Sequence, residues 1–181
     1  EYSDNTIIAL FSDHGFHLGE KERWAKRSLW EDGTRVPVVV ASPGHKPGQK
    51  TNRPAELLDV FPTLLELAGL PADSTQEGQS LVPLMKNPQR EWNHPAITSF
   101  GLGNYSVRST RYRFIQYFDG SRELYDLSKD PHEWKNLIDN PKLEKVIQEH
   151  ASFIPQKQHP ILPGSSTGHK AYAAAKKQLN K

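Results

Sequence analysis

Two short apolar runs in the first quarter of the chain predict buried strands. Residues 6–11 (TIIALF) and 36–41 (VPVVVA) contain almost no polar positions, and polar turns follow them, SDHG and SPG respectively. Continuous runs of this length, without polar alternation, are typical of strands covered on both faces, as in the parallel sheet of an α/β protein. The segment between the runs shows little apolar periodicity, so we expect a polar loop with scattered aromatic residues there.

A helix is predicted over residues 59–69. Asp59 stands at the N-cap position, Pro62 fits the first turn, and Gly69 stands where a left-handed C-terminal residue is favoured. A short helical turn is expected at residues 79–85. Strand, long loop, strand and helix together make residues 1–94 a fragment of an α/β layer.

From Pro95 onward the pattern becomes that of a small antiparallel sheet. Short β-prone runs separated by turn-forming residues predict a four-stranded meander; the runs are residues 96–100, 105–109, 112–118 and 123–127. A helix over residues 140–150 has an apolar side that is expected to cover this sheet. Residues 95–155 therefore form a second unit, and residues 156–181, which end in a lysine-rich stretch, predict a flexible basic tail.

Composition narrows the classes of site and partner. The 181 residues carry 23 Lys and Arg against 21 Asp and Glu, so net charge gives no argument for a nucleic-acid partner. The absence of cysteine excludes a disulfide scaffold, a thiolate zinc site and a cysteine nucleophile within these residues. No apolar run approaches the roughly 20 residues needed to cross a bilayer, so we expect no membrane span.

The candidate chemistry lies directly after the first predicted strand. Asp13 and His14 stand at a strand end, where ligand sites of open α/β sheets form. A carboxylate there is a ligand for Ca²⁺ or Mg²⁺, and an adjacent imidazole can complete the shell or contact an anionic substrate. Gly15 allows the backbone to turn away at once. The alternative is an aspartate that caps the following turn beside a hydrogen-bonded histidine.

Further polar residues in the following loop add to this interpretation. Lys26 lies twelve residues past His14, and if the loop folds back its ammonium would offset the charge of a bound sulfate or phosphate ester. Arg35 is a candidate for the same role or for bracing the loop. Trp24 and Trp30 either wall a pocket or, as we favour, pack as core aromatics.

His17 is a second histidine of this loop. It is a candidate metal ligand, substrate contact or proton donor, although a lone loop histidine is more often exposed to solvent.

In order along the chain, these motifs resemble the C-terminal half of the type I sulfatases. The motifs are Ser12-Asp13-His14-Gly15, Leu18-Gly19-Glu20, Trp24-Ala25-Lys26, Thr34-Arg35-Val36-Pro37, Ser42-Pro43-Gly44, Leu57-Leu58-Asp59-Val60-Phe61-Pro62-Thr63-Leu64, Ala68-Gly69-Leu70, Gly78-Gln79-Ser80-Leu81, Glu123-Leu124-Tyr125-Asp126-Leu127, Asp130-Pro131 and Asn136-Leu137. The resemblance covers residues 5 to 155 and is greatest to the iduronate-2-sulfatase-like branch. It implies an α/β fold. Residues 1–94 would be the C-terminal half of an alkaline-phosphatase-like catalytic sheet, and residues 95–155 an antiparallel subdomain packed against a C-terminal helix.

The resemblance also implies roles for individual residues. Asp13 and His14 would be two ligands of one divalent ion, normally Ca²⁺ with Mg²⁺ as an alternative, and Lys26 would contact the sulfate group and complement its charge in the transition state. His17 is retained as a candidate substrate contact. The substrate would be a sulfated sugar or related ester, and such enzymes are usually exported or lysosomal.

The nucleophile that the resemblance implies is not found in these residues. It is a formylglycine made from the first residue of a Cys/Ser-x-Pro-x-Arg motif, and no such motif occurs in the 181 residues. We therefore expect the nucleophile in an upstream segment and expect this chain alone to be inactive. Two alternatives remain open, a phosphomonoesterase or phosphonate hydrolase of the same superfamily and a non-catalytic metal-binding remnant.

Overall fold

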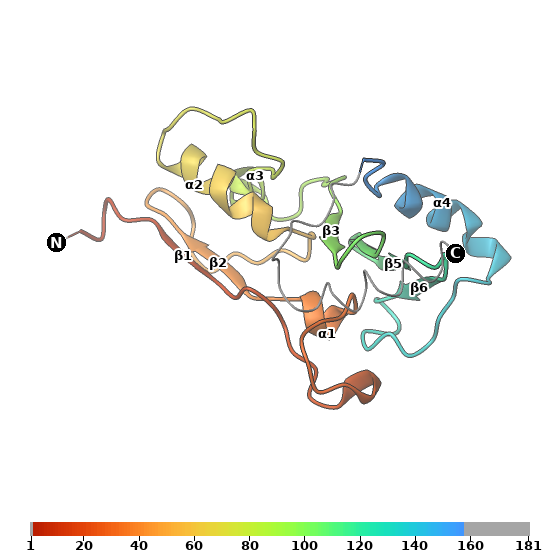
Figure 1. Ribbon diagram of the computed structural model, residues 1–181. Helices are drawn as coiled ribbons and strands as arrows, with labels where there is room; N and C mark the ends of the chain where they lie inside the picture. The colour runs from red at the N-terminus through yellow and green to blue at the C-terminus, as the bar shows by residue number, and fades with distance from the viewer. Residues whose placement is uncertain (1, 158–181) are drawn as a thin grey trace, which may run out of the picture.

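The computed structural model describes residues 2–157 and places them in two neighbouring units (Figure 1). Residues 2–94, called the first unit here, hold a two-stranded ribbon and three short α-helices, and residues 95–157, the second unit, hold a four-stranded sheet with one α-helix. In chain order the elements are β1 (Ile8–Phe11), η1 (Glu20–Glu22), α1 (Glu31–Thr34), β2 (Val38–Ala41), η2 (Leu57–Asp59), α2 (Val60–Leu67), α3 (Val82–Lys86), β3 (Ala96–Ser99), β4 (Tyr105–Arg108), β5 (Tyr112–Gln116), β6 (Arg122–Asp126), η3 (Pro141–Leu143) and α4 (Glu144–Ser152).

Both predicted apolar strands are present, but their predicted environment is wrong. β1 pairs antiparallel with β2, from Ile8 opposite Ala41 to Phe11 opposite Val38. The chain between them folds back as a loop, whereas parallel neighbours need a crossover on one face of the sheet. The ribbon has no further strand beside it within the described residues, so its apolar side chains are largely exposed, with Leu10 at 57% and Val39 at 57%.

The predicted helix α2 is preceded by a capped turn, η2, and Asp59 does not cap α2 as expected. Glu56 is the N-cap residue of η2, and the side chains of Glu56 and Asp59 each accept a hydrogen bond from the other's backbone N–H. The buried Asp59 carboxylate accepts hydrogen bonds from the backbone N–H groups of Glu56 at 2.8 Å and Gln79 at 2.7 Å. Asp59 therefore joins the start of α2 to a later loop instead of capping α2 itself. Gly69 does take the left-handed conformation expected of it, with φ 67°.

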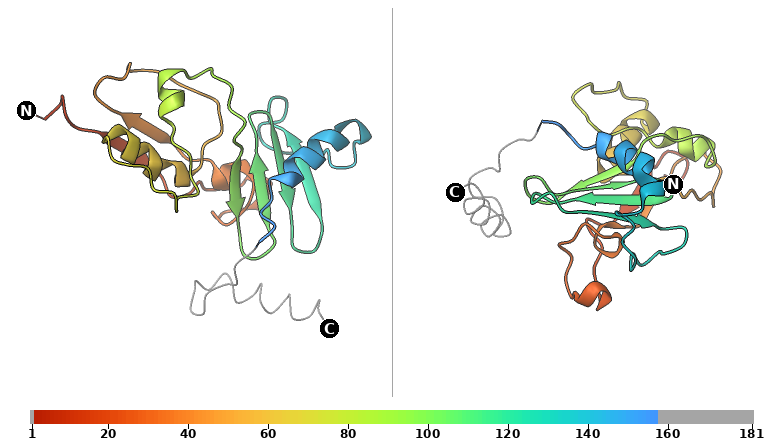
Figure 2. Two further views of the ribbon diagram at one scale, coloured as in Figure 1. Left: turned by 90° about the horizontal axis from the view of Figure 1, so that it is seen from above. Right: turned by 90° about the vertical axis from the view of Figure 1, so that its right-hand side faces the viewer.

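The antiparallel sheet is confirmed in order β3-β4-β5-β6. The predicted helix, seen as η3 and α4, covers one face, and Ile147 packs with Val107, Phe114 and Leu124. The loop that carries η1 and α1 lies on the opposite face, as the right-hand view of Figure 2 shows. There Leu29 packs against Ile115 of β5. The sheet thus fixes the position of the loop in which the candidate chemistry lies.

The predicted basic tail lies almost entirely outside the described residues, which end at residue 157. Among the described helices, none combines the length and the apolar character that a membrane crossing requires.

Candidate functional site

Asp13 and His14 lie where the sequence predicts them, directly after β1. The Asp13 side chain is 81% exposed and that of His14 is 34% exposed, and Asp13 Oδ2 lies 3.5 Å from His14 Nε2. A carboxylate oxygen and an imidazole nitrogen are thus presented together at one strand end. This arrangement suits a shared cation better than a turn cap, because no backbone N–H of the described residues donates to the Asp13 carboxylate.

Lys26 joins this pair because the loop folds back, which is the condition that its candidate role requires. Its Nζ lies 2.7 Å from His14 Nε2, although twelve residues separate the two along the chain. His14 Nδ1 lies 2.7 Å from the carbonyl oxygen of Gly15, to which only an N–H can donate. Nε2 then carries the lone pair, which accepts the hydrogen bond from Lys26 here and would bind a metal once Lys26 moves away.

Gly15 is needed for close packing. A Cβ atom built on Gly15 would lie 2.9 Å from the carbonyl oxygen of Arg35 and closer still to that of Asp32. The Gly15 N–H donates to the carbonyl of Gly33 at 3.1 Å. The end of β1 is therefore pressed directly against the backbone of α1, which holds the Asp13 and His14 segment in place.

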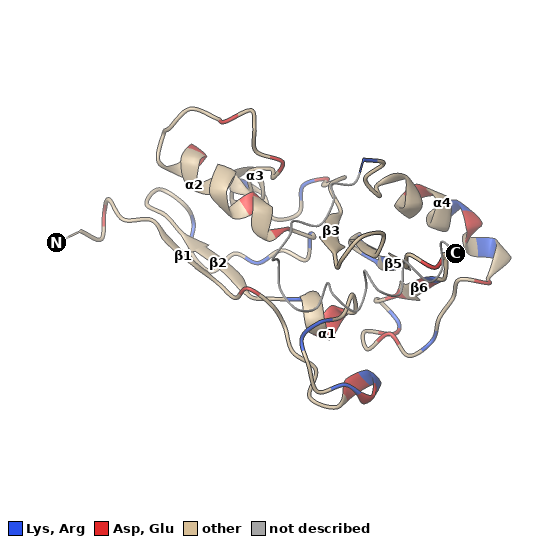
Figure 3. Ribbon diagram, viewed as in Figure 1, with Lys and Arg blue, Asp and Glu red and all other residues tan. Residues whose placement is uncertain are grey.

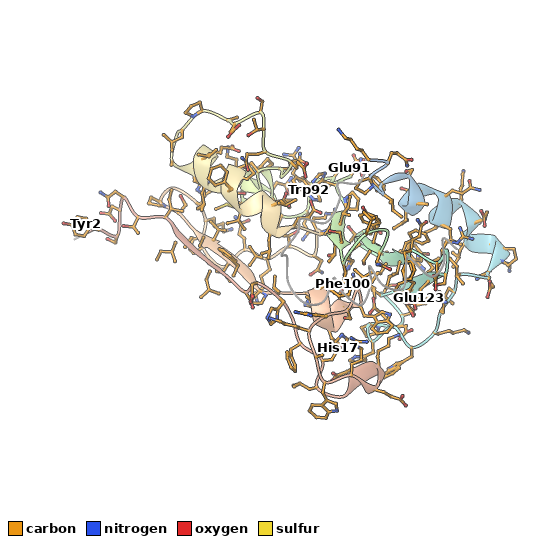
Figure 4. The ribbon with its side chains drawn as sticks, viewed as in Figure 1. Tyr2, His17, Glu91, Trp92, Phe100 and Glu123 are labelled. Carbon is orange, nitrogen blue, oxygen red and sulfur yellow. The ribbon has the colours of Figure 1, made fainter. Side chains whose placement is uncertain are left out.

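His17 is not the exposed loop residue that the sequence favours. Its side chain is fully buried, Nε2 lies 2.6 Å from Ser28 Oγ, and the ring packs edge-on against Trp30. In Figure 4 the labelled His17 lies in the loop region beneath α1. Burial favours a role in holding the loop over direct contact with a substrate. The core position expected for Trp24 is also wrong, because its side chain is 73% exposed.

A buried charge network supports the same loop from the sheet, and the sequence analysis missed it. Arg113 of β5 is ion-paired with Glu31 of α1 and, at 2.7 Å between Nε and Oε1, with Glu133. It also donates to the Leu29 carbonyl at 3.0 Å and to Ser106 Oγ at 2.6 Å. The only signal in the sequence is a lone arginine inside an otherwise apolar strand. The network ties α1, and through it the candidate site, to the second unit.

The two carboxyls of this network respond differently to Arg113. Burial opposes ionisation of Glu31, but the charges of Arg113 and Arg108 and their hydrogen bonds hold its pKa below the ordinary value. For Glu133, burial outweighs the attraction of Arg113 and raises the pKa. The Glu31 carboxylate is therefore the one whose charge depends most on the arginines.

Lys21 fixes the far end of the loop. Its ammonium lies 4.6 Å from the ring centre of Tyr125 and 4.9 Å from that of Trp30, and it donates to the carbonyl of Glu133. Lys21 itself adopts a left-handed backbone conformation with φ 55°. This conformation is unfavourable for a residue with a Cβ, and the aromatic contacts together with the hydrogen bond to Glu133 stabilise it.

A wide hollow of about 1730 Å³ opens beside Asp13, His14 and Lys26. Eight of its lining side chains are Lys or Arg and three are Asp or Glu, which favours an anionic ligand. The basic lining residues are Lys26, Arg27, Arg35, Lys46, Lys50, Arg53, Arg108 and Arg113. Figure 3 shows Lys and Arg segments in the loops around α1 and β2.

Comparison with known proteins gives a consistent match. A family model described as "N-sulphoglucosamine sulphohydrolase, C-terminal" matches residues 19–159. A protein named "Sulfatase" from Formosa agariphila is 43% identical over 155 residues, which is 86% of this chain and 31% of that protein. The chain thus spans about a third of the length of this relative.

Two solved structures share the fold. The structure of BT4656 in complex with its substrate D-glucosamine-2-N,6-O-disulfate has a TM-score of 0.72 at 28% identity, over 82% of this chain and 33% of that one. Phosphonate monoester hydrolase of Agrobacterium radiobacter has a TM-score of 0.71 at 26% identity, over 82% and 34%. These findings do not confirm the expected iduronate-2-sulfatase-like branch.

Proposed function

The chain belongs to the type I sulfatase family as its C-terminal portion, and from this premise we propose that the protein containing it hydrolyses sulfate esters of sugars. The observation that carries the proposal is the convergence of Asp13, His14 and Lys26 at the end of β1, beside a basic hollow. A sulfate ester is a compact anion, and its hydrolysis develops further charge on oxygen, which suits this grouping.

Asp13 and His14 fit a divalent cation, which sulfatases in general use. The Gly15 carbonyl fixes the His14 ring so that Nε2 faces the Asp13 carboxylate. One carboxylate and one imidazole satisfy only part of a shell of six or more ligands, so other parts of the protein must supply the rest. We assign Ca²⁺ with Mg²⁺ as the alternative, and the bound cation would supply Lewis-acid polarisation of a sulfate oxygen.

Lys26 would bind the sulfate group. Its Nζ donates to His14 Nε2 at 2.7 Å, so the ammonium already lies at the nitrogen that would face a cation. Repulsion from a cation held by Asp13 and His14 would turn Lys26 toward the nearest anion, which is the ester. In that position it complements charge that develops on the sulfate oxygens in the transition state.

The nucleophile is expected to come from outside this chain. The 181 residues contain no cysteine and no Ser-x-Pro-x-Arg pattern from which a formylglycine could be made. BT4656, whose structure resembles this chain, was solved with a sulfated glucosamine as its substrate. We therefore propose a sulfated sugar as the substrate, with the basic hollow contributing to its recognition.

The test uses the full-length protein and a panel of sulfated monosaccharides and disaccharides, with sulfate release as the readout. Lys26→Ala should lower kcat/KM by about 100-fold or more while bound calcium stays at wild-type content, as expected for loss of a charged transition-state contact. Asp13→Ala should lose both calcium and turnover. Lys142→Ala, which removes an exposed lysine of η3, is the matched control and should retain full activity.

Wild-type turnover in both Lys26→Ala and Asp13→Ala would refute the assigned roles. The similarity to a phosphonate monoester hydrolase gives a second candidate function. It would be favoured if the same panel, extended with phosphonate and phosphate monoesters, showed a higher kcat/KM for those esters. A protein that binds calcium through Asp13 and His14 but hydrolyses none of these esters would be the non-catalytic remnant.

A further inference from the structure

Three metal-binding side chains of one loop meet behind the candidate active site. They are His17, which precedes η1, Glu20, which opens η1, and Asp32 of α1. One ligand atom of each lies within 4.8 Å of those of the other two. Some point therefore lies within about 2.8 Å of all three atoms, so an inward movement of at most about 0.7 Å would give the distances of a bound zinc ion.

His17 supplies the observation that points to a ligand. The side chain has no accessible surface, and within residues 2–157 its Nδ1 has no hydrogen-bond partner, while Nε2 lies at Ser28 Oγ. A buried nitrogen without a partner is unfavourable, and such atoms are rare in folded proteins. If Nε2 carries the hydrogen and donates to Ser28, Nδ1 has a free lone pair, which is the form of imidazole that binds metals.

The two carboxylates are placed to complete such a site. Glu20 is oriented by the Leu18 N–H, which donates to Oε2 at 2.7 Å, and this bond holds the pKa of Glu20 below its usual value. The half-buried Asp32 carboxylate makes no hydrogen bond or ion pair in the described part of the chain. Lys21, the adjacent cation, has its ammonium at the carbonyl of Glu133 and does not neutralise the pair.

We propose that His17, Glu20 and Asp32 bind a divalent transition-metal ion, with Zn²⁺ as the probe, at a site separate from Asp13 and His14. One imidazole and two carboxylates suit Zn²⁺ better than Ca²⁺, which takes oxygen ligands almost exclusively. The ion would join three points of the loop between β1 and α1. Because the Asp32 backbone packs directly on Gly15, binding would brace the segment that carries His14.

The test measures zinc in the full-length protein carrying Asp13→Asn and His14→Gln, so that the proposed calcium site is removed. The protein is stripped with a chelator and dialysed against buffered free Zn²⁺, and metal per chain is measured by mass spectrometry. We expect this parent protein to bind one zinc ion per chain. Adding His17→Gln, Glu20→Gln or Asp32→Asn should abolish this binding or lower its affinity at least tenfold. Zinc should also raise the Tm of the parent and not that of these variants.

The controls separate this site from loop damage and from other zinc sites. Glu22→Gln changes an exposed carboxylate of the same η1 turn and should retain the zinc. If His17→Gln fails to fold, Asp32→Asn tests the same site from a half-buried position. The proposal is overturned if the parent binds no zinc, or if its bound zinc is unaffected by Asp32→Asn and Glu20→Gln. Neither zinc content nor Tm depends on turnover, so the outcome of this test does not decide whether the proposed sulfatase activity is correct.

Discussion

Replacing Arg113 by methionine is expected to destabilise the protein strongly. The Arg113 side chain is 2% exposed and is the only described cation paired with both Glu31 and Glu133. Methionine fills a similar volume without charge, so the main effect is to leave two buried carboxyls without their shared partner. Removing one member of a buried ion pair costs about 3–5 kcal/mol, and we expect a loss of that size in the free energy of unfolding.

The magnitude can be checked by a more exposed arginine and by a rescue. Arg111 is bidentate with the buried Asp126, but the Arg111 side chain is 49% exposed and Ser128 Oγ also donates to Asp126, so Arg111→Met should cost less. The measurement is urea unfolding of the full-length protein, with tryptophan fluorescence as the probe of the folded fraction. Adding Glu31→Gln to Arg113→Met should recover part of the loss, because the neutral amide removes a buried charge that only the longer contact with Arg108, at 3.4 Å, still opposes.

A loss below about 1 kcal/mol for Arg113→Met would refute this reasoning, since such a value is typical of an exposed ion pair. So would a double variant that is less stable than Arg113→Met alone. Either result would mean that Arg108, which already contacts Glu31, or solvent compensates the buried carboxyls once Arg113 is removed.

Three further changes test other contacts. Gly15→Ala should lower stability and weaken calcium binding, read by Tm and calcium titration, because the new Cβ would overlap the Asp32 carbonyl; an unchanged Tm would contradict the close approach. Burial lowers the pKa of His150, so between pH 7 and pH 5 the unfolded chain takes up a proton that the folded chain does not, and stability falls as the pH falls. His150→Gln should flatten this fall in Tm, and an equally steep profile would exclude His150 as its source. Lys21→Met should cost about 1–2 kcal/mol in urea unfolding through loss of its contact with the Tyr125 ring, and no change would show that the ring contacts are not what holds η1.

Much of the second unit follows from local pattern. The four strands of the meander and α4 were predicted within a few residues, because short β-prone runs separated by turn residues pair with their chain neighbours. The apolar side of this helix faces the sheet as expected, and its Ile147 and His150 are buried.

The first unit shows where local pattern fails. The apolar run at residues 36–41 predicts a strand buried on both faces, yet Val39 of β2 is mostly exposed. An apolar run specifies a strand but carries no information about what will cover it or in which direction its neighbour runs. His17 and Trp24 were misjudged for the same reason, since burial of a loop side chain depends on which distant segment packs over it.

The sequence by itself determined the candidate chemistry. Asp13, His14 and Lys26 were identified as residue types at a strand end and in a returning loop, because ligand chemistry belongs to the side chain and strand ends can be read locally. Only the tertiary structure decided how they are held. The contact of Gly15 with α1 and the pairing of Arg113 with Glu31 join residues 17 to 82 positions apart, and no local pattern encodes which of many possible distant partners will meet.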